Sequence, residues 1–334
     1  MPKRLKKINL RNLEKIIFSS VLDPSNNPKT YEIRIRENPA FLSKSRIVPE
    51  RELRKVETTG KTRILRLKKC FFCNPKKYCA KFSPQTKLKK QYFLNDSVVF
   101  SNLFPFGEVH GVLVYNYKKH IVDPRSLNIK NWVDGIRLIQ KIGKASKKKY
   151  VSMNINKGQK AGASLEHFHS QFHCEDEPFS KTVLSMNLTK KLAKKSELWW
   201  KSWVMSMGEE GLVIDFDNAS RTVMYGEWCP VFGKAEIVIM TMKNPSFLSM
   251  NNKEIGAVAK FLDKGIKTIM EISDQFNVVN MSASPDDDFC NQFRIFSRSP
   301  FSDGAKSWEG YAEFMEETIP HINPKKLVEI AGKY

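Results

Sequence analysis

Several features are scarce in this sequence, and each absence excludes a class of protein. Six cysteines among 334 residues are too few for a disulfide-stabilised scaffold. No apolar run approaches the ~18 residues of a membrane-spanning helix, and runs such as Ser97-Val98-Val99-Phe100 have the length of a strand. Acidic residues are outnumbered by basic ones, 35 to 56, which gives a formal net charge of +21. That excess indicates an anionic partner: a phosphorylated small molecule, a nucleic acid or an acidic surface.

Hydrophobic residues, by contrast, are abundant enough to form a core. They make up 41% of the chain, with 11% aromatic residues, which excludes wholesale disorder. At about 150 residues per domain the length predicts two domains. Residues 3–17 mix basic and apolar side chains, as a targeting peptide does, but Glu14 and Asp23 interrupt that pattern. We therefore expect a terminal helix there and a cytoplasmic protein.

Two stretches of the chain share the order strand, helix, strand, turn, strand. The first is predicted at 111–115, 131–146, 150–153 and 164–173, and the second at 236–240, 252–273, 278–281 and 291–295. The economical interpretation is an α+β fold of two similar units packed together, with a link near 190–215. We set the two units at residues 1–195 and 196–334. Only the first has histidines on its last strand.

That last strand carries the strongest functional signal. A period of two residues would put four polar side chains on one face, namely His167, His169, Gln171 and His173. Packing alone gives no reason to align imidazole rings in this way, so we interpret the face as a functional site. Just upstream, the small residues of 156–164 would let backbone N–H groups approach a phosphate closely.

A second signal is the Cys-x-x-Cys pair of Cys70 and Cys73. In a protein whose cysteines are reduced, such a pair indicates metal or redox chemistry. The lysine runs, such as 147–149, keep a nucleic-acid-binding protein as an alternative. No aromatic residues are interleaved with them, as single-strand binding by base stacking would require.

The run from Asn156 to Gln171 resembles a known active-site segment. Its spacing, Asn-x-Gly-x-x-x-Gly-x-Ser-x-x-His-x-His-x-Gln, is similar to that of galactose-1-phosphate uridylyltransferase and its relatives in the histidine-triad superfamily, including ADP-glucose and dinucleoside polyphosphate phosphorylases. Weaker matches follow the family's order at 36–39, 47–54, 70–73, 99–104, His120 and 309–313. The resemblance implies two histidine-triad-like units in pseudo-repeat, each an antiparallel sheet with packed helices. The second unit would lack the histidines.

The resemblance also implies a zinc ion as cofactor. Its ligands would be Cys70, Cys73, His120 and His167, and two thiolates with two imidazoles make a closed, structural site. Other cysteines and histidines stay open as alternative ligands: Cys79, Cys174, His110 and His173.

The catalytic residues implied by the resemblance are His169 and Gln171. The neutral imidazole of His169 would attack the α-phosphorus of a nucleotide sugar and form a nucleotidyl-histidine. Gln171 would donate a hydrogen bond to the transferred phosphoryl group. A glutamine suits this position because both the leaving group and the second nucleophile are phosphate anions, which need no proton transfer.

The substrate-binding residues implied by the resemblance are spread along the chain. They are Arg51 and Arg54 for the phosphates, Asn102 and Phe104 for the nucleoside, Asn156, Gly162 and Ser164 for the α-phosphate, and Glu313 for the sugar. We expect a nucleotidyltransferase that joins a nucleotide sugar and a sugar phosphate or inorganic phosphate, and a homodimer. The alternatives are a phosphorylase of a nucleoside diphosphate sugar or dinucleoside polyphosphate, and a zinc-stabilised basic protein that binds nucleic acid.

Overall fold

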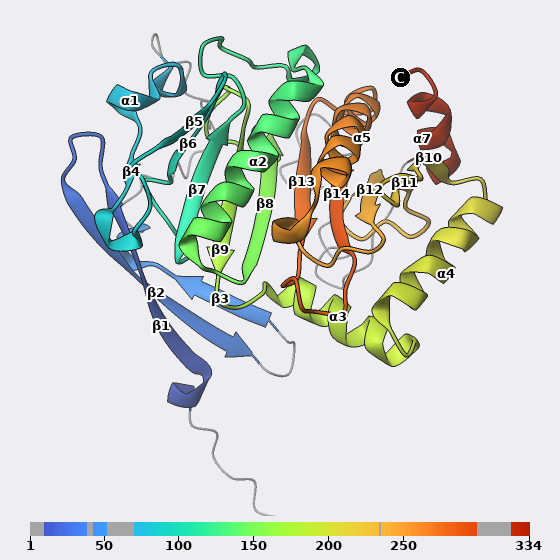
Figure 1. Ribbon diagram of the computed structural model, residues 1–334, viewed down its shortest axis with the longest axis horizontal. Coiled ribbons are helices and arrows are strands. Elements are labelled where there is room, and N and C mark those ends of the chain that lie inside the picture. The colour runs from blue at the N-terminus through green and yellow to red at the C-terminus, as the bar shows by residue number, and fades with distance from the viewer. Residues whose placement is uncertain (1–9, 39–42, 52–69, 234, 299–321) are drawn as a thin grey trace, which may run out of the picture.

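The computed structural model describes residues 10–38, 43–51, 70–233, 235–298 and 322–334 (Figure 1). Its centre is an antiparallel sheet of ten strands in the order β10-β11-β12-β14-β13-β8-β9-β7-β6-β5. The strands are β5 (Tyr92–Leu94), β6 (Ser97–Ser101), β7 (Val109–Val114), β8 (Tyr150–Lys157), β9 (His169–Glu175), β10 (Val213–Asp217), β11 (Thr222–Gly226), β12 (Glu236–Thr241), β13 (Phe276–Met281) and β14 (Asn291–Ser297). The predicted α+β fold is confirmed.

The strands of the two halves of this sheet follow the same order, as the repeated order of elements in the sequence suggested. Counted inward from its two edges, the sheet runs β5, β6, β7, β9, β8 and β10, β11, β12, β14, β13. The two halves meet where β8 pairs with β13, with Ile155 opposite Val278. Each half has the predicted order of strands and one long helix. The interpretation as a pseudo-repeat and the boundary at 195/196 stay predictions, and that boundary falls between two helices, α3 (Ser180–Leu192) and α4 (Ser196–Glu209).

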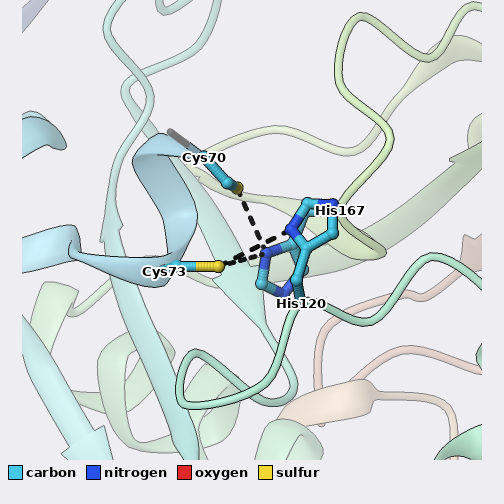
Figure 2. A group of neighbouring side chains, drawn as sticks. All are labelled: Cys70, Cys73, His120 and His167. Carbon is cyan, nitrogen blue, oxygen red and sulfur yellow. Dashed lines mark hydrogen bonds between the residues drawn. The ribbon is translucent and has the colours of Figure 1, made fainter. Parts of the chain in front are cut away.

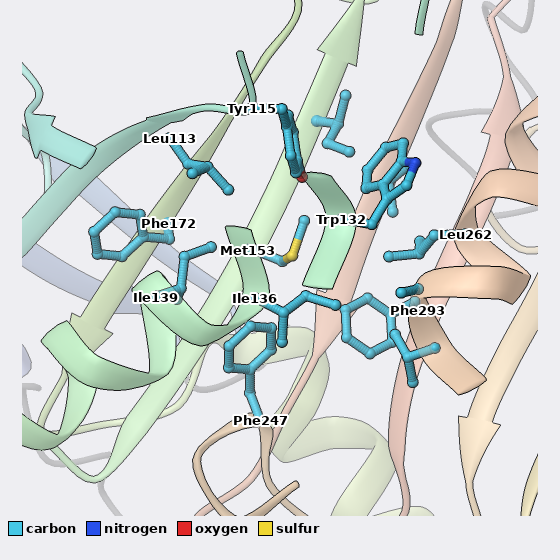
Figure 3. Packing of buried hydrophobic residues seen from close by; sticks show 14 of the residues in the cluster. Leu113, Tyr115, Trp132, Ile136, Ile139, Met153, Phe172, Phe247, Leu262 and Phe293 are labelled. Carbon is cyan, nitrogen blue, oxygen red and sulfur yellow. The ribbon is translucent and has the colours of Figure 1, made fainter. Parts of the chain in front are cut away.

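The two long helices, α2 (Ile129–Ser146) and α5 (Asn252–Met270), lie side by side on one face of the sheet (Figure 1). Both begin with a capping box, formed by Asn128 with Asn131 and by Asn251 with Glu254, which satisfies backbone N–H groups of the first turn. Their apolar faces, with Trp132 and Ile136 of α2 and Leu262 of α5, are buried in a single core (Figure 3). Both halves of the sheet also contribute to this core, for example with Leu113 of β7 and Phe293 of β14. The core thus joins the two halves of the sheet.

The N-terminal region forms a second, four-stranded sheet in the order β3-β2-β1-β4. Its strands are β1 (Glu14–Leu22), β2 (Pro28–Asn38), β3 (Ser43–Ile47) and β4 (Lys81–Phe82). The predicted terminal helix is wrong for residues 14–17, which begin β1. Ile17 lies opposite Ile33 of β2, and both are buried, so a tertiary partner selects the extended backbone. Residues 1–9 lie outside the described part of the chain.

Short helices complete the described chain. They are the 3₁₀ turns η1 (Leu10–Leu13), η2 (Pro49–Arg51), η3 (Phe71–Cys73), η4 (Pro84–Thr86), η5 (Pro124–Ser126) and η6 (Phe247–Ser249), and the α-helices α1 (Pro75–Tyr78) and α7 (Pro324–Ala331). No helix among the described residues has both the length and the apolar character needed to cross a membrane.

Candidate functional site

The predicted site residues converge on β9. This strand lies between β7 and β8, and Phe172 on its inner face is fully buried in the core beneath α2. The opposite face borders a cavity of about 400 Å³. Seven of the predicted residues line it, from two stretches of the chain: Asn102, Phe104, Asn156, Gly162, Ser164, His169 and Gln171. Apolar and aromatic side chains, Phe72 and Phe100 among them, form much of the remaining wall.

The segment before β9 differs from the prediction. The strand begins at His169 rather than at residue 164, and the preceding residues form a loop. Gly158 and Gly162 have φ values of +88° and +85° in this loop, a conformation that side chains with a Cβ rarely adopt. The prediction that His167 shares the strand face with His169 is therefore wrong, because His167 lies before the strand begins. It belongs to a separate cluster.

That cluster brings together the four predicted metal ligands, as Figure 2 shows. The donor atoms of Cys70, Cys73, His120 and His167 all lie within 4.8 Å of one another. Cys70 Sγ is 3.4 Å from His167 Nδ1, and Cys73 Sγ is 3.6 Å from both His167 Nδ1 and His120 Nδ1. The alternative ligands lie outside the cluster, and the buried Cys79 instead donates to the Phe71 carbonyl.

The donor set of this cluster fits a metal ion of the zinc type. Two sulfurs and two imidazole nitrogens are the ligands that closed zinc sites use. Bonds of 2.0–2.3 Å in a tetrahedron would put sulfur and nitrogen about 3.5 Å apart. The observed separations of 3.4 and 3.6 Å match that value. The cluster joins η3 to the loop that leads into β9, two residues before His169.

Hydrogen bonds assign opposite tautomers to the two neighbouring histidines. His167 Nε2 is 3.0 Å from the Asn116 carbonyl, and His169 Nδ1 is 2.7 Å from the His167 carbonyl. A carbonyl only accepts, so each of these nitrogens carries the proton. His167 Nδ1 is thus left with its lone pair toward the cysteines, and His169 Nε2 is left with a lone pair for chemistry. Burial also lowers the pKa of both rings, that of His167 to about 4, which favours the neutral imidazoles.

Gln171 is held by two donors at its carbonyl end. Asn102 Nδ2 donates to Gln171 Oε1 at 3.2 Å, and His110 Nε2 lies 2.8 Å from the same oxygen. The side-chain oxygen of Asn102 accepts from the Phe104 N–H, which directs its amide nitrogen toward Gln171. Sequence reasoning considered His110 only as an alternative metal ligand. The signal that could have found it is its place on β7, opposite His173 of β9, which puts both rings on the site face.

The remaining predicted residues are distributed differently. His173 lies on β9 but does not line the cavity, and its ring stacks on that of His110 with centroids 4.1 Å apart. Arg54 and Glu313 lie outside the described residues, and Arg51 is described only as the last backbone position of η2. A second cavity of about 220 Å³ shares His169 and Asn156 with the first and includes Asp274 and Gln275, which the sequence did not suggest.

Solved structures of other proteins share this fold. One similar structure, a uridylyltransferase, has a TM-score of 0.58 at 13% identity, over 71% of this chain and 84% of the other. An ADP-glucose phosphorylase from Arabidopsis thaliana with bound ADP-glucose has a TM-score of 0.57 at 14% identity, over 90% of this chain and 98% of the other. A GalT-like protein from the same plant has a TM-score of 0.54 at 15% identity, over 71% of this chain and 83% of the other.

The chain therefore shares the fold of a uridylyltransferase and an ADP-glucose phosphorylase, as the predicted resemblance implied. No protein-family model matches the sequence, and no curated protein matches it either. The evidence for function is therefore the geometry of the site itself.

Proposed function

We propose that this protein is a nucleotidyltransferase that acts through a covalent nucleotidyl-His169 intermediate. It would move a nucleoside monophosphate from a nucleotide sugar to a sugar 1-phosphate. The observation that carries this proposal is the state of His169. Its Nδ1–H is bound to the His167 carbonyl at 2.7 Å, and it lines a cavity together with Gln171. A neutral imidazole with its Nε2 lone pair available is the form that attacks phosphorus.

In the first step His169 Nε2 forms a bond to the α-phosphorus, and the bond from that phosphorus to the bridging oxygen breaks. The sugar 1-phosphate leaves with the electron pair of that bond. The imidazole becomes positively charged while its Nδ1–H is retained, and the His167 carbonyl stabilises this charge. In the second step an oxygen of the acceptor phosphate attacks the same phosphorus, and the bond to Nε2 breaks.

The charge that develops on the transferred phosphoryl oxygens needs hydrogen-bond donors. Gln171 lines the cavity with its carbonyl oxygen already occupied by Asn102 and His110, which leaves its amide N–H groups for the phosphoryl oxygens. Leaving group and acceptor are both phosphate oxygens of low basicity, so neither step requires a general acid or base.

We further propose zinc as the occupant of the four-residue cluster. Bound there, the ion would stabilise the segment that leads into β9, because it would link three separate segments of the chain. These segments carry Cys70 and Cys73, His120, and His167. All four positions are then protein ligands, so the ion would have a structural role. The predicted homodimer and cytoplasmic location stay predictions.

A phosphorylase is the second candidate, with inorganic phosphate in place of the sugar phosphate as acceptor. The similar structure of an ADP-glucose phosphorylase, which covers 90% of this chain, supports that alternative. Both candidates share the first step and differ only in the acceptor that completes the reaction.

The test is intact-mass spectrometry after brief mixing with single donors: UDP-glucose, UDP-galactose, ADP-glucose, GDP-glucose and diadenosine tetraphosphate. We expect an acid-labile increase by one nucleoside monophosphate in wild type, whose mass identifies the base. His169→Ala should show none. Sugar 1-phosphates and inorganic phosphate, added separately, then show which acceptor removes the adduct.

His173→Phe is the matched control, because His173 is a buried histidine of the same strand that does not line the cavity. It should form the adduct as wild type does. The absence of an adduct with every donor, in folded protein, would contradict the proposal. The nucleic-acid alternative would then be tested by salt-dependent binding that survives His169→Ala.

A further inference from the structure

The hydrogen bonds around Gln171 point to a positioning residue on the neighbouring strand. A glutamine amide can be rotated by half a turn with little change in shape, and the two orientations present opposite polarity. With its Nε2 toward a phosphoryl oxygen, Gln171 would donate a hydrogen bond. With its Oε1 there, it would repel the anion. Something must select the orientation, and Gln171 itself does not.

The geometry points to His110 as that selector, and we propose that it is a positioning residue that holds the Gln171 amide with its N–H groups toward the cavity. This inference rests on the proposed function of Gln171. His110 Nε2 lies 2.8 Å from Gln171 Oε1, which is the shortest hydrogen-bond distance recorded for that side chain.

The direction of this hydrogen bond follows from the other nitrogen of the ring. The backbone N–H of Phe106 donates to His110 Nδ1 at 3.4 Å. A nitrogen that accepts a hydrogen bond carries its lone pair, so in the neutral ring the proton is on Nε2. Asn102 Nδ2 also lies 3.1 Å from His110 Nε2, but a protonated Nε2 cannot accept from it, and the Asn102 amide donates to Gln171 Oε1 instead. His110 therefore donates to Gln171 Oε1. Since Oε1 accepts from both His110 and Asn102, a flipped Gln171 amide would place its own N–H groups against two donors.

Packing holds the His110 ring in the orientation this requires. The side chain is 2% exposed. It contacts the Phe106 ring, with centroids 4.4 Å apart, and stacks on His173 at 4.1 Å and 28°. Among the described residues, Gln171 Nε2 has no recorded hydrogen-bond partner, although Gln171 lines the cavity. Oε1 is thus held from behind while the amide N–H groups face the space where the phosphoryl group would lie.

The kinetic test compares His110→Phe, which keeps an aromatic ring for the stack but loses the donor, with His110→Gln, whose amide can donate from about the same position. We expect His110→Phe to slow adduct formation in a single turnover by about 10- to 100-fold, part of the effect of losing one charge-stabilising donor. The nucleotide concentration for half-maximal rate should stay within about threefold, because the effect belongs to the transition state. His110→Gln should recover most of the rate.

Two comparisons separate positioning from general damage. In a Gln171→Ala background, His110→Phe should cost no more than about twofold, because its target is gone. His173→Phe keeps an aromatic ring in the same stack, leaves Gln171 untouched and should leave the rate near that of wild type. Equal losses in His110→Phe and His173→Phe, or additive losses in the double variant, would overturn the proposal.

A second measurement does not depend on activity. Long-range ¹H–¹⁵N correlation spectra of the uniformly labelled full-length protein report the tautomer of each imidazole. We expect His110 as the Nε2–H form, and an Nδ1–H form would overturn the proposal, whatever the substrate is. If wild type forms no adduct with any donor, the proposed function fails, while this spectrum still decides the orientation of the His110 hydrogen bond.

Discussion

Burial determines the protonation of the titratable side chains around β9. It lowers the pKa of His167, His169 and His173, and it raises the pKa of the Glu175 carboxyl to about 7 against the opposing effect of Arg46. Arg46 Nη1 lies 2.9 Å from Glu175 Oε1, so the pair is close, yet the loss of water around the carboxylate outweighs it. The imidazoles are therefore neutral near pH 7 and Glu175 is partly protonated.

The raised pKa of Glu175 predicts that the free energy of unfolding depends on pH. The folded carboxyl holds its proton up to about pH 7, while the unfolded one releases it near its ordinary value of 4.5. The contribution of Glu175 to the free energy of unfolding is thus present below pH 4.5 and is lost as the pH rises to 7. We expect the free energy of unfolding of wild type, minus that of Glu175→Gln, to fall by about 1 kcal/mol per pH unit between pH 5 and 7.

Urea unfolding followed by tryptophan fluorescence at pH 5, 6, 7 and 8 measures this difference. Taking the difference cancels the opposite contribution of the buried histidines. Glu177→Gln is the control: hydrogen bonds from Lys15 and Lys44 lower the pKa of Glu177 to about 2, so its contribution should be nearly constant over this range. A difference for Glu175 that rises with pH would contradict the prediction.

At the scale of elements, the metal-ligand cluster connects segments that the sheet alone does not join. Cys70 precedes η3 and Cys73 is its last residue, His120 follows β7, and His167 precedes β9. The loop from residue 158 to 168 contains two glycines with positive φ, and His167, next to the last residue of this loop, belongs to the cluster. The start of β9, and with it the position of His169, therefore depends on this connection.

Removal of the proposed zinc should then affect stability and reaction together. We expect one zinc per chain by plasma mass spectrometry. A chelator should lower the melting temperature by about 5 °C or more and slow adduct formation, and both should return with zinc. The reason is that the segment before β9 would lose its connection to η3.

Cys73→Ser should reproduce the effect of the chelator, since it removes one of two thiolates. Cys229→Ser is the matched control, because Cys229 is an exposed cysteine outside the cluster. Full zinc content in Cys73→Ser, or an unchanged melting temperature after complete removal of zinc, would show that the cluster is not a structural metal site.

At the scale of the molecule, one hydrophobic core extends across both halves of the ten-stranded sheet. It includes Trp132 and Ile136 of α2 as well as Leu262 of α5 and Phe293 of β14 (Figure 3). The sheet is continuous through the pairing of β8 with β13. The two predicted units therefore share their core instead of each enclosing its own.

A shared core predicts cooperative unfolding. Leu262→Ala, in the half without the site, should cost about 3 kcal/mol and lower a single melting transition that also disrupts the site in the other half. Calorimetry measures the transition, and cobalt substituted for zinc would report the metal cluster by its absorbance. Leu198→Ala, on the half-exposed face of α4, should change little. Two separate transitions would mean that the units unfold independently.

The grouping of most predicted residues around one cavity was predictable because these residues are close in the sequence. Asn156, Gly162, Ser164, His169 and Gln171 lie within 16 residues, and their spacing is visible in the sequence. Hydrophobic periodicity likewise predicted α2 and α5, since a buried helix face repeats every three to four residues whatever its partner. The family resemblance added Cys70, Cys73 and His120, which lie close to His167 in the structure.

Only the tertiary structure decided the features that depend on a partner strand. The sequence pattern at residues 14–17 suits a helix or a strand, and pairing with β2 selects the strand. His110 is 61 residues from Gln171, and only the register of β7 against β9 brings its ring to that amide. Single residues and their spacing thus determined which groups are available for chemistry. Strand pairing determined which of their atoms face one another, because register depends on contacts between segments far apart in the chain.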